Sequence, residues 1–132
     1  ILGEGKERLN LENKIKSLQL ENKVLLKGHV SNVYPYFKKA SLCVVSSRIE
    51  GFPNVLLQMM SQNNKVVATK CAGGIDQIDG IVLSEVNNAN NLYQAIKISI
   101  KANTIDNRGK FDKELATRSI ESFLECINVE LE

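Results

Sequence analysis

The sequence has few of the residues that metal centres and disulfide frameworks require. It contains one histidine, no tryptophan and three cysteines, Cys43, Cys71 and Cys126, and no two cysteines form a Cys-x-x-Cys pair. A zinc site is not expected, because structural zinc takes a set of Cys and His ligands. An odd number of cysteines, with Cys43 inside an apolar run, is typical of free thiols in a reducing compartment.

The chain also lacks long apolar runs and clusters of one charge. No stretch reaches the roughly 18 apolar residues that a membrane-spanning helix needs, and no signal-peptide pattern is present. The net charge is +2 and the lysines are scattered, so no basic stripe indicates a nucleic-acid partner. With 132 residues, 43% apolar and 24% charged, the sequence predicts at most one globular domain. It begins at Ile1 without a methionine, and we expect it to be a fragment of a longer protein.

Short continuous apolar runs alternate with segments of helical spacing. The predicted strands are 24–26, 42–45, 65–69 and 81–83, and the predicted helices are 4–19, 32–40, 54–63, 89–101 and 112–127. Strands that are apolar on both faces belong to parallel sheets covered by helices on both sides. The order predicts an α/β fold with a Rossmann-like doubly wound parallel sheet. In the helix 54–63, the residues Val55, Leu56, Met59 and Met60 are predicted to form the buried stripe.

The segment from Ser46 to Gln58 carries the clearest functional signal. The strand 42–45 leads into the loop Glu50-Gly51-Phe52-Pro53, and a helix is predicted to begin near Asn54. Such a loop and helix N-terminus direct several backbone N–H groups and the positive end of the helix dipole at one point, which binds phosphate or another anion. Glu50 stands at the start of the loop, where it could bind sugar hydroxyls beside that anion. Asn54 is equally suited, by residue type, to cap the helix.

This segment resembles the donor-binding signature of the retaining, nucleotide-sugar-dependent glycosyltransferases of family 4, or group 1, which have the GT-B fold. The likeness covers residues 1 to about 100 and keeps the family's order over five blocks, 1–5, 23–30, 34–40, 46–58 and 65–74. The resemblance implies the C-terminal half of a GT-B fold, truncated at its N-terminus. Residues 1–132 would then form a partial nucleotide-sugar-binding domain, with the N-terminal acceptor domain absent.

The resemblance also implies an activity. It is the transfer of a hexose from a nucleoside-diphosphate sugar to a glycan or lipid-linked glycan acceptor, with retention and without metal or other cofactor. The implied setting is bacterial surface polysaccharide synthesis, such as lipopolysaccharide or capsule, in the cytoplasm, with peripheral contact to the inner membrane through the missing domain. The fragment alone is expected to be inactive. It is also expected to lack the central strand of its sheet, and therefore to be unstable by itself.

The resemblance assigns roles to particular residues. Glu50 is implied to be catalytic, through its contact with the hexose. The implied donor-binding residues are Gly51, Phe52, Pro53, Asn54, Val55, Gln58 and His29. The family has a glutamate where Gln58 stands, and that glutamate accepts hydrogen bonds from both ribose hydroxyls. Glutamine has one acceptor oxygen, so it can replace about one of those bonds, at a cost of about 1–2 kcal/mol in donor affinity.

Two other interpretations follow from the sequence. Three features favour a truncated or decayed, non-catalytic remnant, or a split-gene product that needs a partner chain: Gln58, the missing basic Gly-Arg…Lys-Gly segment of the family, and the short segment between Gln77 and Ile81. A Rossmann domain for a different nucleotide is less favoured, because no Gly-x-Gly-x-x-Gly sequence occurs.

Overall fold

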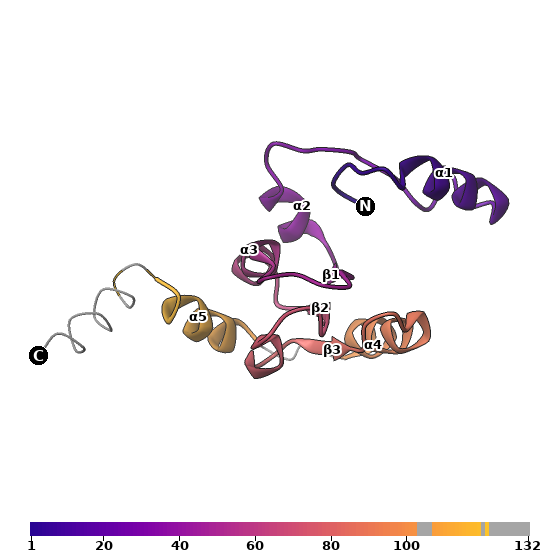
Figure 1. The fold of residues 1–132 in the computed structure, drawn as a ribbon. Coiled ribbons are helices and arrows are strands. Elements are labelled where there is room, and N and C mark those ends of the chain that lie inside the picture. The colour runs from indigo at the N-terminus through magenta and orange to yellow at the C-terminus, as the bar shows by residue number, and fades with distance from the viewer. Residues whose placement is uncertain (103–106, 120, 122–132) are drawn as a thin grey trace, which may run out of the picture. The chain divides into compact units, whose positions relative to one another are not determined.

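The computed structural model describes residues 1–102, 107–119 and 121. The chain divides into two compact units, Ile1–Val33 and Tyr34–Glu132, which are described separately. The second unit contains a three-stranded parallel sheet in the order β1-β2-β3, formed by β1 (Cys43–Val45), β2 (Val66–Thr69) and β3 (Val82–Ser84) (Figure 1). Val44 pairs with Val67, and Ala68 pairs with Leu83, so β2 is the central strand and β1 is an edge strand.

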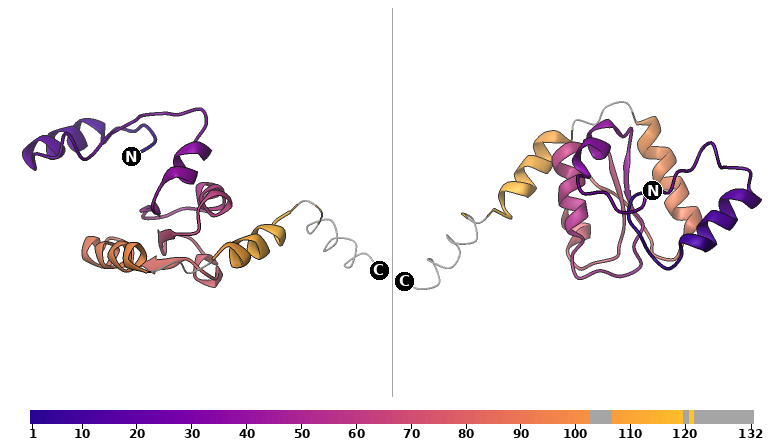
Figure 2. Two further views of the ribbon diagram at one scale, coloured as in Figure 1. Left: turned by 180° about the vertical axis from the view of Figure 1, so that it is seen from behind. Right: turned by 90° about the horizontal axis from the view of Figure 1, so that it is seen from above.

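Helices cover both faces of this sheet. The helices of the second unit are α2 (Tyr34–Lys39), α3 (Asn54–Gln62), α4 (Ala89–Lys101) and α5 (Arg108–Ala116), and a short 3-10 helix η1 spans Ile75–Gln77. α3 packs on β1 and β2, α4 packs on β2 and β3, and α2 and α5 contact α3. Figure 2 shows α3 on one side of the strands and α4 on the other. The predicted α/β class with a parallel sheet is confirmed.

The core of the second unit lies around β2. All four residues of β2 are buried, as a parallel strand covered on both faces requires. From α3, Leu56, Met59 and Met60 are buried, which confirms the prediction that the methionines fill the core. The predicted burial of Val55 was wrong, since its side chain is 37% exposed. Val55 lies about 90° around the helix from the middle of the buried stripe, and it belongs to the first turn beside the open loop.

The boundaries of α4 were predicted correctly, but those of α5 were not. α5 begins at Arg108, whereas the prediction began at 112, because Gly109 weakens the helical pattern in the first turn. The fully buried side chain of Phe111 anchors that turn and overrides the propensity. The end of the predicted helix, and Cys126, lie outside the described residues. Cys43 and Cys71 are buried and free.

The first unit contains α1 (Arg8–Ser17) and no regular strand. The predicted strand 24–26 was wrong. Its extended contacts are with the first residues of the chain, through an antiparallel bridge between Gly3 and Gly28 and the hydrogen bond from Lys27 N to Ile1 O (2.9 Å). A strand needs a partner along its whole length, and this short antiparallel contact does not provide one. No helix among the described residues is long and apolar enough to cross a membrane.

Candidate functional site

The loop 46–53 connects the carboxyl end of β1 to α3. Two hydrogen bonds attach it to the end of the neighbouring strand β2. The hydroxyl of Thr69 donates to the carbonyl oxygen of Ser47 (2.6 Å), and the backbone N–H of Glu50 donates to the carbonyl oxygen of Cys71 (2.8 Å). Thr69 is buried, so the first of these contacts is fixed by the core. The loop is therefore held at the edge of the sheet where open α/β folds bind their ligands.

The carboxylate of Glu50 is oriented by a neighbouring side chain. The hydroxyl of Ser47 donates to Oε1 of Glu50 over 2.8 Å. Glu50 is exposed, and a carboxylate can accept more hydrogen bonds than the one that Ser47 donates. It can therefore accept further bonds from the hydroxyls of a sugar. Neither Ser47 nor Thr69 was predicted from the sequence, although the spacing of Ser47 three residues before Glu50 was a usable signal.

The N-terminus of α3 has no side-chain cap. Its N-cap residue is Pro53, and Asn54 is the first helical residue, so the interpretation of Asn54 as the cap was wrong. The reason is that Pro53 has an extended conformation (φ −78°, ψ 96°) while Asn54 already has helical geometry. The backbone N–H of Leu56 bonds to the carbonyl oxygen of Pro53 (2.8 Å). Because proline has no side-chain acceptor, no cap competes with an anion for the N–H groups of Asn54 and Val55.

The end of the loop, residues 51–53, is packed at Phe52 and Pro53 and open at Gly51. The ring of Phe52 is half-buried, and the guanidinium carbon of Arg118 lies 4.4 Å from its centroid. Pro53 is buried. A Cβ atom added to Gly51 would meet no atom within 4 Å, so a ligand can approach this part of the backbone closely. The contribution of Phe52 and Pro53 to the shape of a sugar site stays a prediction.

The remaining predicted donor residues lie in different places. Gln58 is half-buried on α3, one turn after Asn54 and on the same side of the helix. It is therefore near the uncapped N-terminus, as the ribose role requires, although that role stays a prediction. His29 is exposed and belongs to the first unit, where it follows Gly28, whose φ is +70°. Its role near a nucleobase also stays a prediction.

A cavity that the sequence analysis did not find lies at the carboxyl ends of all three strands. Its volume is about 430 Å³, and it is lined by Ser46, Arg48, Thr69, Glu85, Asn87, Asn88, Ala89 and Leu92. Asn88 caps α4 by accepting a hydrogen bond from the backbone N–H of Asn91 (2.9 Å). Glu85 pairs with Lys70, and the hydrogen bond between them raises the pKa of Lys70. These bonds engage Oδ1 of Asn88 and Oε1 of Glu85.

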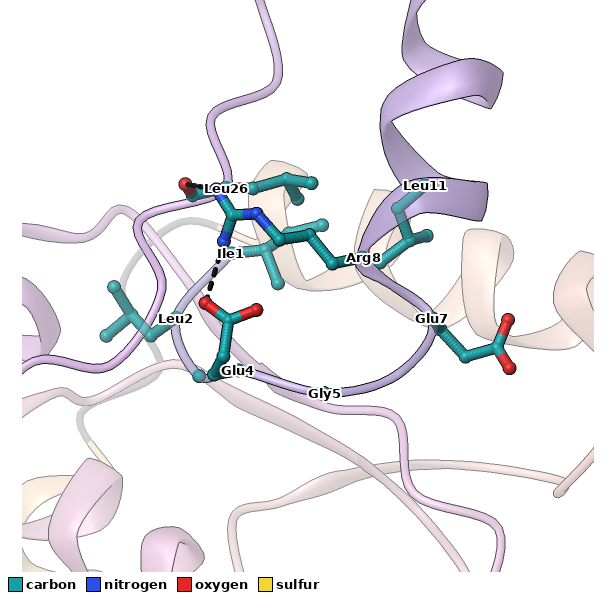
Figure 3. A pocket seen from close by; sticks show the side chains of 9 residues that line it. Ile1, Leu2, Glu4, Gly5, Glu7, Arg8, Leu11 and Leu26 are labelled. Carbon is teal, nitrogen blue, oxygen red and sulfur yellow. Dashed lines mark hydrogen bonds and ion pairs between the residues drawn. The ribbon is translucent and has the colours of Figure 1, made fainter.

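The first unit has a smaller pocket of about 240 Å³, drawn in Figure 3. Arg8 crosses it and is paired with Glu4 (2.8 Å) and Glu12 (2.9 Å), and it also contacts the carbonyl oxygen of Leu26 (3.4 Å). Because two carboxylates neutralise this guanidinium, the pocket offers little positive charge to an anion.

Comparison with known proteins places the chain in a family. The family model described as glycosyl transferases group 1 matches residues 1–101. The chain is 37% identical over 105 residues to the N-acetylgalactosamine-N,N'-diacetylbacillosaminyl-diphospho-undecaprenol 4-alpha-N-acetylgalactosaminyltransferase of Campylobacter jejuni, covering 76% of this chain and 29% of that protein. It is 26% identical over 131 residues to the lipopolysaccharide core biosynthesis glycosyltransferase LpsE of Rhizobium meliloti, covering 89% and 38%. The chain thus spans about a third of the length of these relatives.

Solved structures support the fold. A sucrose-phosphate synthase from Thermosynechococcus elongatus superposes with a TM-score of 0.72 at 21% identity, over 96% of this chain and 35% of that one. The lipopolysaccharide outer core galactosyltransferase WaaB superposes with a TM-score of 0.65 at 20% identity, over 86% and 35%. These proteins have the GT-B fold, and the likeness confirms the Rossmann-like architecture. The chain belongs to the group 1 (family 4) glycosyltransferases of the GT-B fold.

Proposed function

We propose that this chain binds the donor in a retaining glycosyltransferase, which transfers a hexose from a nucleoside-diphosphate sugar to a glycan acceptor. The observation that carries the proposal is the geometry of the loop 46–53. The loop places an oriented carboxylate, Glu50, and the uncapped N-terminus of α3 on either side of Gly51 and Phe52. A carboxylate suits the hydroxyls of a sugar, and a helix N-terminus suits a diphosphate. Together they match the two halves of a nucleotide sugar.

Each part of the site has a proposed task. The N–H groups of Asn54 and Val55 and the dipole of α3 stabilise the negative charge that develops on the departing diphosphate. Glu50 accepts hydrogen bonds from the hexose and fixes its orientation, which lowers the barrier by positioning. The amide oxygen of Gln58 accepts a hydrogen bond from one ribose hydroxyl. We propose that no metal ion takes part.

The relatives suggest the biological setting. One is named as acting on a diphospho-undecaprenol-linked sugar, and another is named for lipopolysaccharide core biosynthesis. We propose that the acceptor is a lipid-linked or surface glycan of a bacterium, and that the protein works in the cytoplasm at the inner membrane. The alternative function, a non-catalytic remnant, is favoured by Gln58 standing in the place of the family's glutamate.

The replacement of Glu50 by glutamine tests the proposal in a longer form of the protein that carries an acceptor domain, because residues 1–132 alone are expected to be inactive. The amide keeps the size of the side chain but loses the charge that binds and orients the hexose. We expect turnover with nucleotide sugars to fall by about 100-fold or more, while affinity for the free nucleoside diphosphate changes by about twofold or less. Calorimetry measures the affinity, and release of diphosphate measures the turnover. Asp112→Asn, which changes an exposed ion pair on α5, is the matched control.

Two results would contradict the proposal. The first is an equal loss of diphosphate affinity and turnover in Glu50→Gln, because Glu50 would then not address the sugar. The second is a wild-type protein that binds no nucleoside diphosphate, which would favour the non-catalytic remnant.

A further inference from the structure

Arg118 lies against the loop that carries the proposed site, although it is more than 60 residues away in the sequence. Its guanidinium carbon is 4.4 Å from the centroid of the Phe52 ring, which is within the range of a cation–π contact. Its Nε donates to Oε1 of Glu114 over 2.7 Å, one turn earlier along the chain. The side chains of Arg118 and Glu114 are 36% and 23% exposed, so solvent screens this arrangement only in part. Glu114 and Phe52 thus hold one guanidinium from two directions.

The helix before Arg118 is attached firmly to the core. Phe111 of α5 is fully buried, and α5 contacts α3. The amide of Asn107, just before α5, donates to the carbonyl oxygens of Asn64 (3.1 Å) and Gly80 (2.9 Å). The backbone N–H of Arg118 bonds to the carbonyl oxygen of Leu115 (3.2 Å), which keeps the residue close to the end of α5. Arg118 therefore reaches Phe52 from the end of a helix that the core holds.

Phe52 lies near the end of the loop, between the two groups that the proposed function uses. Glu50 lies two residues before it and Asn54 two residues after it. The part of the loop around Glu50 is attached to Thr69 of β2 and to Cys71 just after this strand, and the far end continues into α3. Between these attachments, the exposed Gly51 is the residue that allows the widest range of backbone conformations, and a held Phe52 ring narrows that range. The contact with Arg118 supplies that restraint.

We propose that Arg118 is a positioning residue for donor binding. By stacking on Phe52 it keeps Glu50 and the N-terminus of α3 in the relative placement that a nucleotide sugar requires. The identity of the ligand in this inference rests on the proposed function. The ordering of the loop by Arg118 is independent of that function. Loss of the contact should cost affinity because the ligand would have to order the loop when it binds.

The test measures hydrogen exchange of the backbone amides in residues 50–56 of the full chain, together with calorimetric binding of UDP and of GDP. In Arg118→Met, which keeps an apolar stem but no cation, exchange in this segment should rise about three- to tenfold, and exchange in β2 should not change. The dissociation constant of the diphosphate that binds should rise by a similar factor. Arg118→Lys should restore part of both effects, because it restores the cation without the planar group.

A second background separates the contact with Phe52 from a general loss of stability. In Phe52→Leu, the further change Arg118→Met should have no effect on loop exchange or on affinity, because the contact is already gone. A full effect of Arg118→Met in that background would overturn the inference. Unchanged loop exchange in Arg118→Met alone would also overturn it, as would faster exchange with unchanged diphosphate affinity. A wild-type protein that binds neither diphosphate contradicts the proposed function instead, since amide exchange needs no ligand.

Discussion

The replacement of Asn63 by alanine is expected to open the contact between α2, α3 and β2. Asn63 follows the last residue of α3 and is 8% exposed. Its Nδ2 donates to the carbonyl oxygens of Phe37 (2.8 Å) and Ala40 (2.7 Å), and its Oδ1 accepts from the backbone N–H of Lys65 (2.8 Å). One amide thus satisfies three backbone groups, two at the end of α2 and one just before β2, and it joins both places to the end of α3.

The size of the effect follows from these bonds. A hydrogen bond of this kind stabilises a folded protein by about 1 kcal/mol net, and a buried group left without a partner costs about that much or more. The carbonyl oxygen of Phe37 keeps a second partner, the backbone N–H of Ala40 (3.3 Å), so losing its bond to Asn63 costs the least of the three. We expect the free energy of local opening to fall by about 2–3 kcal/mol. Opening would then be about 30- to 150-fold more frequent.

Hydrogen exchange of the amides in α3 and β2 of the full chain measures this opening directly. Asn64→Ala is the matched control, because Asn64 is exposed and its backbone oxygen keeps its bond with Asn107. It should change exchange by about twofold or less. Asn63→Asp should be destabilising at neutral pH, because only a protonated carboxyl can donate to a carbonyl oxygen. The raised pKa of its folded state means that stability is lost as the pH rises through that pKa. If Asn63→Ala behaves like Asn64→Ala, the reasoning is refuted.

Three further predictions concern the site and the core. Gln58→Glu should tighten nucleoside-diphosphate binding by about tenfold in calorimetry, since each ribose hydroxyl then finds an acceptor oxygen. An unchanged affinity would mean that Gln58 does not face a ribose. Burial raises the pKa of the Cys43 thiol to about 11, from the reference value of 9.0. Alkylation of this thiol at pH 8 should therefore be about 100-fold slower in the folded protein than in urea, and peptide mass spectrometry can measure both rates. The same shift makes stability fall as the pH rises from 9 toward 11, because the unfolded chain loses the proton first. Gly80→Ala should lower the free energy of unfolding in urea by more than about 1 kcal/mol, since Gly80 has φ +92° and an added Cβ would lie 3.0 Å from the Phe111 ring. Gly109→Ala should raise this free energy by about 0.5–1 kcal/mol, because its added Cβ meets open space in α5.

The sequence predicted those helices and strands whose formation depends on neighbouring residues. The helix at 89–101 was predicted with its observed bounds, because its apolar spacing is regular. The structure adds that Asn88 caps its N-terminus. The strand predicted at 65–69 was found at Val66–Thr69, because a short run of apolar, mostly β-branched residues is typical of a strand covered on both faces. The strand 24–26 was predicted by the same apolar pattern and did not form, because a strand also depends on a partner that its own sequence does not specify.

The candidate site also has one part that the sequence predicts and one part that depends on the tertiary structure. The sequence by itself determined the order of strand, loop and helix that places Glu50 and the N-terminus of α3 next to each other, since these groups are neighbours along the chain. Only the tertiary structure decided how the loop is held, because its supports come from the end of β2 and from the residues after α5. Thr69 reaches Ser47, and Arg118 reaches Phe52, across 22 and 66 positions, and no local pattern specifies contacts at such separations. They form because the parallel register of β1 and β2 aligns their carboxyl ends and because Phe111 anchors α5 to the core.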